Sequence, residues 1–118
     1  MRGVLVIAHG SRARETESAM EAVLSMVKAK MPDIIMECAF MEFSERTIEK
    51  GVSALVALGV TEIRVVPYFL FMGIHMKEDI PEMVARCAAN YRDVTITMGE
   101  PLGIDGRLAD IIVERIMA

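Results

Sequence analysis

Apolar side chains are concentrated in four short runs along the chain. These runs lie at Val4–Ala8, Ile34–Met41, Ile63–Val66 and Val94–Met98. The first is apolar at successive positions, which is typical of a strand buried on both faces of a parallel sheet. We therefore predict one strand at each run.

Four segments with helical periodicity follow these runs. In each segment, apolar side chains recur at intervals of three and four residues and so share one face of a helix. The residues on these faces are Met20, Val23, Leu24 and Val27, then Ile48, Val52, Leu55 and Val56, then Ile80, Met83, Val84 and Cys87, and finally Leu108, Ile111 and Ile112. The predicted order is therefore a strand and a helix, repeated four times.

Particular residues indicate where these helices begin and end. Ser44 is suited to cap the second helix, and Gly59 to end it, because glycine readily adopts left-handed backbone. The run Asp79-Ile80-Pro81 is typical of a helix start, which predicts a long loop from Tyr68 to about Glu78 before the third helix. Asp105 is expected to cap the last helix.

Strands that alternate with helices pair in parallel through right-handed crossovers. We therefore predict an α/β fold: one small doubly wound domain over residues 1–118, with a four-stranded parallel sheet in the order 2-1-3-4 and helices on both faces. A sheet of this size has two open edges, so the burial of an edge or a face in a dimer is a further expectation.

Composition narrows the class of protein. Of the 118 residues 53% are hydrophobic, and 13 Lys and Arg against 17 Asp and Glu leave a net charge of −4. A mildly acidic chain without a basic run argues against nucleic acid as the partner. No apolar stretch approaches the roughly 18–20 residues of a membrane span, and Val4–Ala8 is too short for a signal peptide. We expect a cytoplasmic protein without a membrane or nucleic-acid partner.

The two cysteines do not have the short sequence spacing that is typical of metal ligands. Cys38 and Cys87 lie far apart in the chain and share no short spacing with each other or with a histidine. We expect both to behave as small buried hydrophobic residues, and we expect neither an iron–sulfur cluster nor a closed structural zinc site.

Candidate chemistry lies where the strands end. In an open parallel sheet, ligands bind beyond the carboxyl ends of the strands where the strand order reverses, here between the first and third strands. The two histidines of the chain, His9 and His75, follow those two strands, and Glu42 follows the second. Neutral imidazole binds divalent transition metals and titrates near neutrality. These residues predict a metal site with open coordination positions, in which Glu42 is a ligand, a base or only a solvated charge.

Other side chains near these strand ends are expected to bind an anionic ligand with flat apolar faces. The alternative is that the charged residues are only surface charges and that the apolar residues belong to the buried core. They are Ser11, Arg12, Arg14, Arg46 and Lys77 for the polar groups, and Phe69, Leu70, Phe71, Met72, Gly73, Ile74 and Met76 for the apolar wall. The motifs GxGxxG, GxxxxGK[ST] and GxSxG are absent, which argues against dinucleotide, P-loop and serine-hydrolase functions.

Five segments together resemble a known family. They are Ala8-His9-Gly10-Ser11-Arg12, Phe40-Met41-Glu42-Phe43, the run from Phe69 to His75, the run from Lys77 to Pro81, and Pro101-Leu102-Gly103. In this order and spacing they are similar to the motifs of the small, archaeal, single-domain CbiX-type (class II) sirohydrochlorin chelatases. Each motif alone is weak, whereas the set covers essentially the whole chain. The chain departs at Ala8, where many relatives have glycine.

The resemblance implies a chelatase/flavodoxin-like fold and a lyase that inserts cobalt or nickel, with iron as a third candidate, into sirohydrochlorin. It implies no ATP, no permanent cofactor, and a homodimer whose two halves share one cleft. Carried over by position, His9 and His75 match the histidines that bind the metal and accept the pyrrole protons, and Glu42 matches the acidic residue beside the metal.

Two alternatives stay open at this point. One is a non-catalytic carrier of a metal ion or tetrapyrrole, which would use the same residues. The other is a hydrolase similar to the histidine phosphatases, which Ala8 disfavours because those enzymes have arginine before the His-Gly pair. The residues also leave open which metal is used, because Co²⁺, Ni²⁺ and Fe²⁺ are similar ions toward imidazole. Cobalt would indicate cobalamin synthesis, nickel the nickel tetrapyrrole of methanogens, and iron sirohaem.

Overall fold

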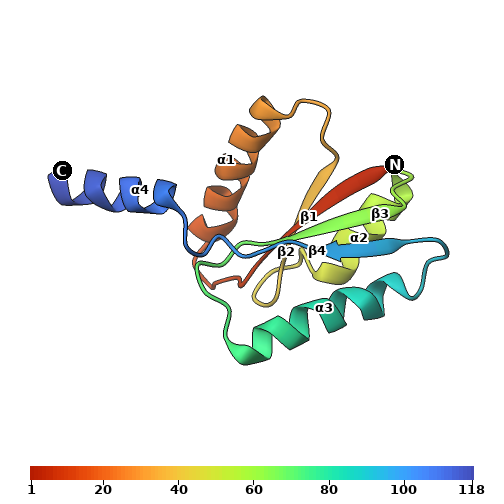
Figure 1. Cartoon of the computed structure of the whole chain (residues 1–118). Coiled ribbons are helices and arrows are strands. Elements are labelled where there is room, and N and C mark those ends of the chain that lie inside the picture. Colours follow the sequence, from red (N-terminus) through yellow and green to blue (C-terminus); the bar gives the residue numbers. More distant parts are fainter.

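Strands and helices alternate along the whole chain in a computed structural model that describes residues 1–118 (Figure 1). None of the helices combines the length and the apolar character that a membrane-spanning segment needs. The elements are β1 (Arg2–Ala8), α1 (Glu15–Lys30), β2 (Met36–Phe40), α2 (Ile48–Ala57), β3 (Glu62–Pro67), α3 (Ile74–Ala88), β4 (Thr95–Met98) and α4 (Gly106–Met117).

All four strands form one parallel sheet in the order β2-β1-β3-β4, which confirms the predicted topology. The central strand β1 pairs with both β2 and β3, so that Val6 lies between Cys38 and Val66. At the carboxyl end, Ala8 lies opposite Phe40. The segments after β1 and β2 therefore leave the sheet side by side.

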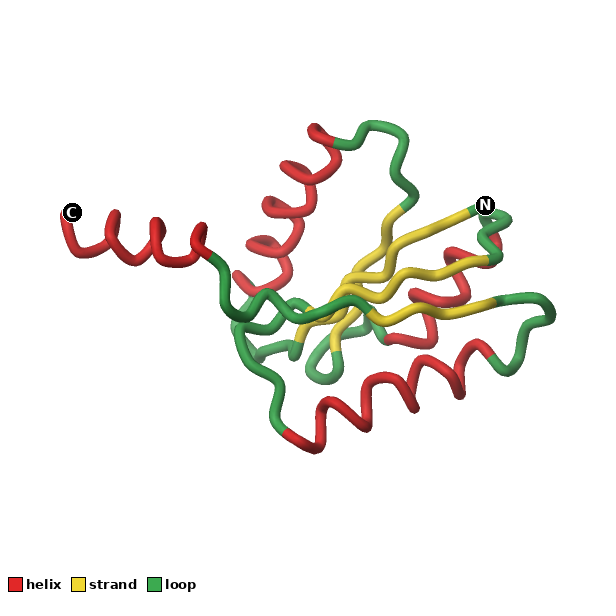
Figure 2. The backbone as a smooth tube through the Cα atoms, viewed as in Figure 1, coloured by secondary structure: helices red, strands yellow, loops and turns green.

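Helices α2 and α3 cover one face of the sheet, and α1 lies on the other (Figures 1 and 2). Side chains alternate along β1, as the two-residue period of a strand requires, so that Leu5 and Ile7 face α2 and α3 while Val6 and Ala8 face α1. The core beneath α2 and α3 comprises Leu5, Ile7, Ala39, Ile48, Val52, Leu55, Val60, Ile63, Val65, Ile80 and Val84. A smaller core beneath α1 comprises Val6, Ala8, Met20, Leu24, Cys38 and Phe40.

The α1 face of the sheet is only partly covered. Figure 2 shows α1 inclined away from the strands toward its C-terminal end. A groove of about 390 Å³ lies between that end of α1 and the starts of β1 and β2, and nine of its eleven lining residues are hydrophobic, among them Val4, Val27, Met31 and Ile35. Helix α1 alone therefore does not cover all the apolar side chains on this face of the sheet.

Helix α4 extends away from the rest of the molecule (Figure 1). The capping role predicted for Asp105 is confirmed, because its carboxylate accepts a hydrogen bond from the N–H of Arg107 at 2.9 Å. No residue of α4 is buried, and Ile112 and Ile116 are 60% and 73% exposed. The apolar stripe predicted for this helix exists, but nothing within the chain covers it.

The start of α2 differs from the prediction. Thr47 caps the helix with its hydroxyl, which accepts a hydrogen bond from the N–H of Lys50 at 3.2 Å. Ser44 lies one turn earlier, where its hydroxyl accepts the N–H of Arg46 at 3.0 Å and closes a local turn. The predicted end is confirmed, since Gly59 follows the helix with a φ of +90°.

The start of α3 also differs. The helix begins at Ile74 after Gly73, so Pro81 lies inside it rather than in its first turn. Proline lacks an N–H and interrupts one intrahelical hydrogen bond, which normally disfavours the interior of a helix. Complete burial of Ile80 and Val84 offsets that loss. The predicted long loop is therefore shorter, and His75 lies on a helix.

Core packing on α2 can be tested with a matched pair of leucines. Leu55 on α2 is completely buried, whereas Leu58, which directly follows the helix, is 58% exposed. We expect Leu55→Ala to lower the free energy of unfolding by about 2–5 kcal/mol, because it removes apolar contacts and leaves a cavity. We expect Leu58→Ala to change it by no more than about 0.5 kcal/mol. Urea denaturation followed by circular dichroism measures both, and equal effects would contradict the packing described.

Candidate functional site

His9 and Glu42 meet at the carboxyl end of the sheet, where the sequence predicts the site. His9 directly follows β1, and Glu42 lies two residues beyond β2. The Nε2 atom of His9 and the Oε1 atom of Glu42 are 2.8 Å apart, and the two side chains are 59% and 49% exposed. The pair is therefore formed in the protein and accessible to a ligand.

Backbone contacts hold this pair together. The N–H of Met41 donates to the carbonyl of Ala8 at 3.0 Å, and the N–H of Glu42 donates to the carbonyl of His9 at 3.1 Å. Gly10 has a φ of +99°, and a Cβ atom there would lie 2.0 Å from the carbonyl oxygen of Glu42. Only glycine fits at this position, because any side chain would force the two segments apart.

A cavity of about 390 Å³ opens beside His9 on the α1 face. Its wall includes Thr16, Met20 and Val23 from α1, together with Tyr68. The N–H of Tyr68 donates to the carbonyl of Ile7 at 2.7 Å, which keeps the segment after β3 beside β1. Sequence reasoning did not select Thr16 or Tyr68, because neither belongs to a chemical motif and only the fold brings them to His9.

His75 lies apart from the pair. It is exposed in the first turn of α3, and the only polar side-chain partner of His9 is Glu42. No three His, Cys, Asp or Glu side chains in the chain are arranged to hold a metal ion. The structure therefore brings together two of the three predicted metal-site residues and leaves the third on a separate element.

The predicted apolar wall occupies the connection from β3 to α3 and the first turn of that helix. Phe69, Met72 and Met76 are half-buried and contact the main core. Leu70, Phe71 and Ile74 are 50%, 82% and 78% exposed. Gly73 and Lys77 are exposed next to them. Ile74 adjoins His75 in the first turn of α3, and Leu70 and Phe71 lie in the connection just before it.

The predicted polar residues after β1 lie in the turn that precedes α1. Ser11 accepts the N–H of Ala13 at 3.1 Å, Arg12 lies with its guanidinium carbon 4.9 Å from the ring centroid of Phe43, and Arg14 is exposed at the start of the helix. Phe43 belongs to one of the family motifs in the sequence, but the sequence analysis assigned it no role. Its φ of +59° is a property of the folded backbone, and no local sequence pattern indicates it.

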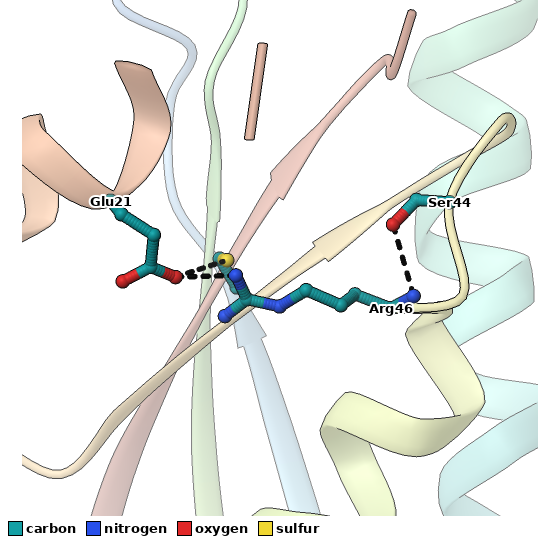
Figure 3. A network of polar contacts seen from close by, with 4 residues as sticks. Glu21, Ser44 and Arg46 are labelled. Atoms are coloured by element: carbon teal, nitrogen blue, oxygen red, sulfur yellow. Dashed lines mark hydrogen bonds and ion pairs between the residues drawn. The ribbon is translucent and has the colours of Figure 1, made fainter. Parts of the chain in front are cut away.

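Arg46 lies in the connection from β2 to α2 and forms an ion pair with a residue of α1. Figure 3 shows its guanidinium directed toward the carboxylate of Glu21 on α1, with which it forms an ion pair. The thiol of Cys38 donates to the same carboxylate at 3.7 Å. Burial raises the pKa of the Cys38 thiol to about 11, although the Arg46 charge opposes this shift. The thiol is thus neutral and buried at neutral pH, whereas Cys87 is only half-buried.

Comparison with known proteins places this chain in a family. A family model described as CbiX matches residues 3–118. The sirohydrochlorin ferrochelatase of Priestia megaterium is 39% identical over 116 residues, which cover 98% of this chain and 44% of that protein. The sirohydrochlorin cobaltochelatase of Methanococcoides burtonii is 32% identical over 123 residues, which cover 98% of this chain and 94% of that protein.

Solved structures agree with the predicted fold. The sirohydrochlorin chelatase SirB from Bacillus subtilis subspecies spizizenii, in complex with cobalt, superposes with a TM-score of 0.89 at 37% identity, over 98% of this chain and 50% of that one. The chain thus spans about half the length of SirB and of the ferrochelatase, and nearly the full length of the cobaltochelatase. The family model, the relatives and the shared fold lead to the same conclusion: the chain belongs to the CbiX family.

Proposed function

We propose that this protein inserts a divalent metal ion into sirohydrochlorin, without ATP and without a permanent cofactor. The observation that carries the proposal is the accessible His9–Glu42 pair at 2.8 Å, at the end of the sheet where ligands bind. Relatives named as sirohydrochlorin ferrochelatases and cobaltochelatases support the substrate and the reaction type. They also support both iron and cobalt as metals, with nickel as a third candidate.

His9 has one nitrogen free for chemistry in this arrangement. A carboxylate only accepts hydrogen bonds, so the neutral His9 ring donates its Nε2–H to Glu42 and keeps the lone pair on Nδ1. That lone pair can bind the incoming metal ion or accept a proton from a pyrrole nitrogen. Glu42 fixes the tautomer and stabilises the imidazolium that forms when a proton arrives.

Metal insertion releases two protons from the macrocycle, and a second base beside His9 would give each proton its own acceptor. We assign His75 to the second proton and to the metal, as the family resemblance implies. The exposed apolar residues around it would contact the flat face of the macrocycle. Arg12, Arg14 and Lys77 would bind its carboxylates.

We propose that two copies of the chain form the working unit. The chain spans 44% of the ferrochelatase, so two copies match the length of that protein. The structure also leaves two complementary apolar surfaces open, the stripe of α4 and the groove beside α1. We propose that α4 of each copy lies in the groove of the other copy. The segment between β4 and α4 directs this helix away from the rest of its own chain (Figure 1). In such a pair, the histidines of both copies would serve one cleft.

The proposed activity is tested by following sirohydrochlorin absorbance anaerobically with Co²⁺, Ni²⁺ or Fe²⁺. We expect the wild type to exceed the protein-free rate. We expect His9→Ala and His75→Ala to lose at least about 100-fold of the catalysed rate, since general acid–base catalysis typically contributes 10²–10⁴-fold. Glu42→Gln should lower the rate. Glu45→Gln serves as the matched control, because Glu45 is an exposed carboxylate of the same connection that takes part in none of the four ion pairs. A spectral shift without any rate enhancement would instead identify a carrier, and a fully active His75→Ala variant would contradict the role of His75.

The proposed dimer is tested with two lysines introduced on α4. Ile112 lies on the apolar stripe and Glu114 on the opposite face of the helix. We expect Ile112→Lys to convert a dimer into a monomer at micromolar concentration, because it places a charge in the apolar groove, and Glu114→Lys to leave the dimer intact. Sedimentation velocity measures both. A wild type that is monomeric, or an Ile112→Lys variant that stays dimeric, would refute the exchange of α4.

A further inference from the structure

Phe43 adopts a backbone conformation that a bulky side chain rarely takes. Its φ is +59°, in the left-handed region where glycine and asparagine are common and an aromatic residue is an outlier. Its ring is 51% exposed, so burial of the side chain does not account for the strain. Strain of this kind persists where the surrounding structure imposes it, and such positions cluster at functional sites.

Hydrogen bonds on either side of Phe43 impose this conformation. Before it, the N–H of Glu42 is bonded to the carbonyl of His9. After it, the N–H of Arg46 is bonded to the hydroxyl of Ser44, and the carbonyl of Arg46 accepts the N–H of Phe40 at 2.8 Å. The chain must therefore reverse within a few residues directly beyond Glu42, and the reversal directs the Phe43 ring toward the segment after β1.

Arg12 is the residue that the ring meets. Its guanidinium carbon lies 4.9 Å from the ring centroid, within the range of about 6 Å over which an aromatic face attracts a cation. Arg12 takes part in none of the four ion pairs of the chain, so no carboxylate of the protein neutralises it. The ring orients the charge and leaves its hydrogen-bond donors free.

The contact between Arg12 and Phe43 lies next to the His9–Glu42 pair in both segments. Arg12 lies three residues after His9, and Phe43 lies one residue after Glu42, so the contact joins the same two segments that carry the site. A planar guanidinium held at this place can bind a carboxylate in a bidentate manner. Side-chain carboxylates of a macrocycle whose centre faces His9 would reach it.

We propose that Phe43 is a positioning residue, which holds the guanidinium of Arg12 beside the His9–Glu42 pair so that it binds a carboxylate of the tetrapyrrole substrate. The identity of the ligand rests on the proposed function, whereas the contact between the two side chains does not.

The proposal predicts an unusual pattern for substitutions of Phe43. Phe43→Gly removes the ring and relieves the left-handed strain, so we expect the variant to fold at least as stably as an ordinary surface variant. We nevertheless expect its KM for sirohydrochlorin and its dissociation constant to rise about threefold to tenfold, the range of a contact between a cation and an aromatic face. Its kcat should change little. Phe43→Tyr keeps the ring and should retain wild-type values.

A double-mutant cycle identifies Arg12 as the group through which Phe43 acts. We expect Arg12→Ala to raise KM at least as much as Phe43→Gly, and Phe43→Gly to have no further effect in the Arg12→Ala background. Equal effects of Phe43→Gly in both backgrounds, or no change in KM in either, would overturn the proposal.

Two readouts separate this proposal from the proposed function. The first is the dissociation constant, measured by fluorescence quenching with sirohydrochlorin alone, which reports the coupling even if no metal is inserted. The second is NMR of the free protein. We expect the Arg12 side-chain protons to be shifted upfield by the ring, and this shift to vanish in Phe43→Leu. Absence of the shift in the wild type would overturn the contact itself, and failure of sirohydrochlorin to bind would overturn both the substrate and the role of Arg12.

Discussion

The candidate site depends on the parallel pairing of β1 with β2, which continues beyond the end of both strands. Two backbone hydrogen bonds past Ala8 join the following segments, and they bring Glu42 so close to Gly10 that no Cβ atom fits between them. A hydrogen bond between two half-exposed side chains contributes little stability by itself. The main chain therefore determines where His9 and Glu42 lie, and their 2.8 Å contact is a consequence of that placement.

The two faces of the sheet differ in how completely the chain covers them. Helices α2 and α3 close one face over a core that includes Leu5, Ile63 and Val84. On the other face α1 covers only the carboxyl half, which leaves the groove near Val4 open. The same chain has an apolar helix with nothing buried on it. An unfilled apolar groove and an unpartnered apolar helix are each costly in water, and the exchange of α4 that we propose would remove both exposures.

Local patterns in the sequence predict most of the fold. Apolar runs such as Val4–Ala8 and the helical spacing of Ile48, Val52 and Leu55 identify strands and helices, because burial acts on side chains in a fixed period. The start of α3 is not predictable in this way. Asp79-Ile80-Pro81 has the chemistry of a helix start, but tertiary burial of Ile80 keeps the helix continuous through Pro81.

The candidate site is predictable to a similar degree. The ends of β1 and β2 identify His9 and Glu42 as neighbours, since parallel strands end at one edge. The left-handed backbone of Phe43 and the cavity beside Tyr68 arise only when segments distant in the sequence meet. The position of His75 in the first turn of α3 is likewise not predicted, because the helix starts earlier than the local pattern indicates.

The proline within α3 has a consequence for the segment that carries His75. Because Pro81 has no N–H, the carbonyl of Lys77 lacks its usual partner four residues on, and the first turn of any helix already has unbonded N–H groups. Residues 74–80 are thus joined to the remainder of α3 by fewer hydrogen bonds than an uninterrupted helix would have, and they are fixed mainly by Ile80 and Met76. Local opening has a low free energy where such bonds are few. His75 therefore lies on a segment with fewer main-chain hydrogen bonds than an unbroken helix would have, whereas His9 directly follows the central strand of the sheet.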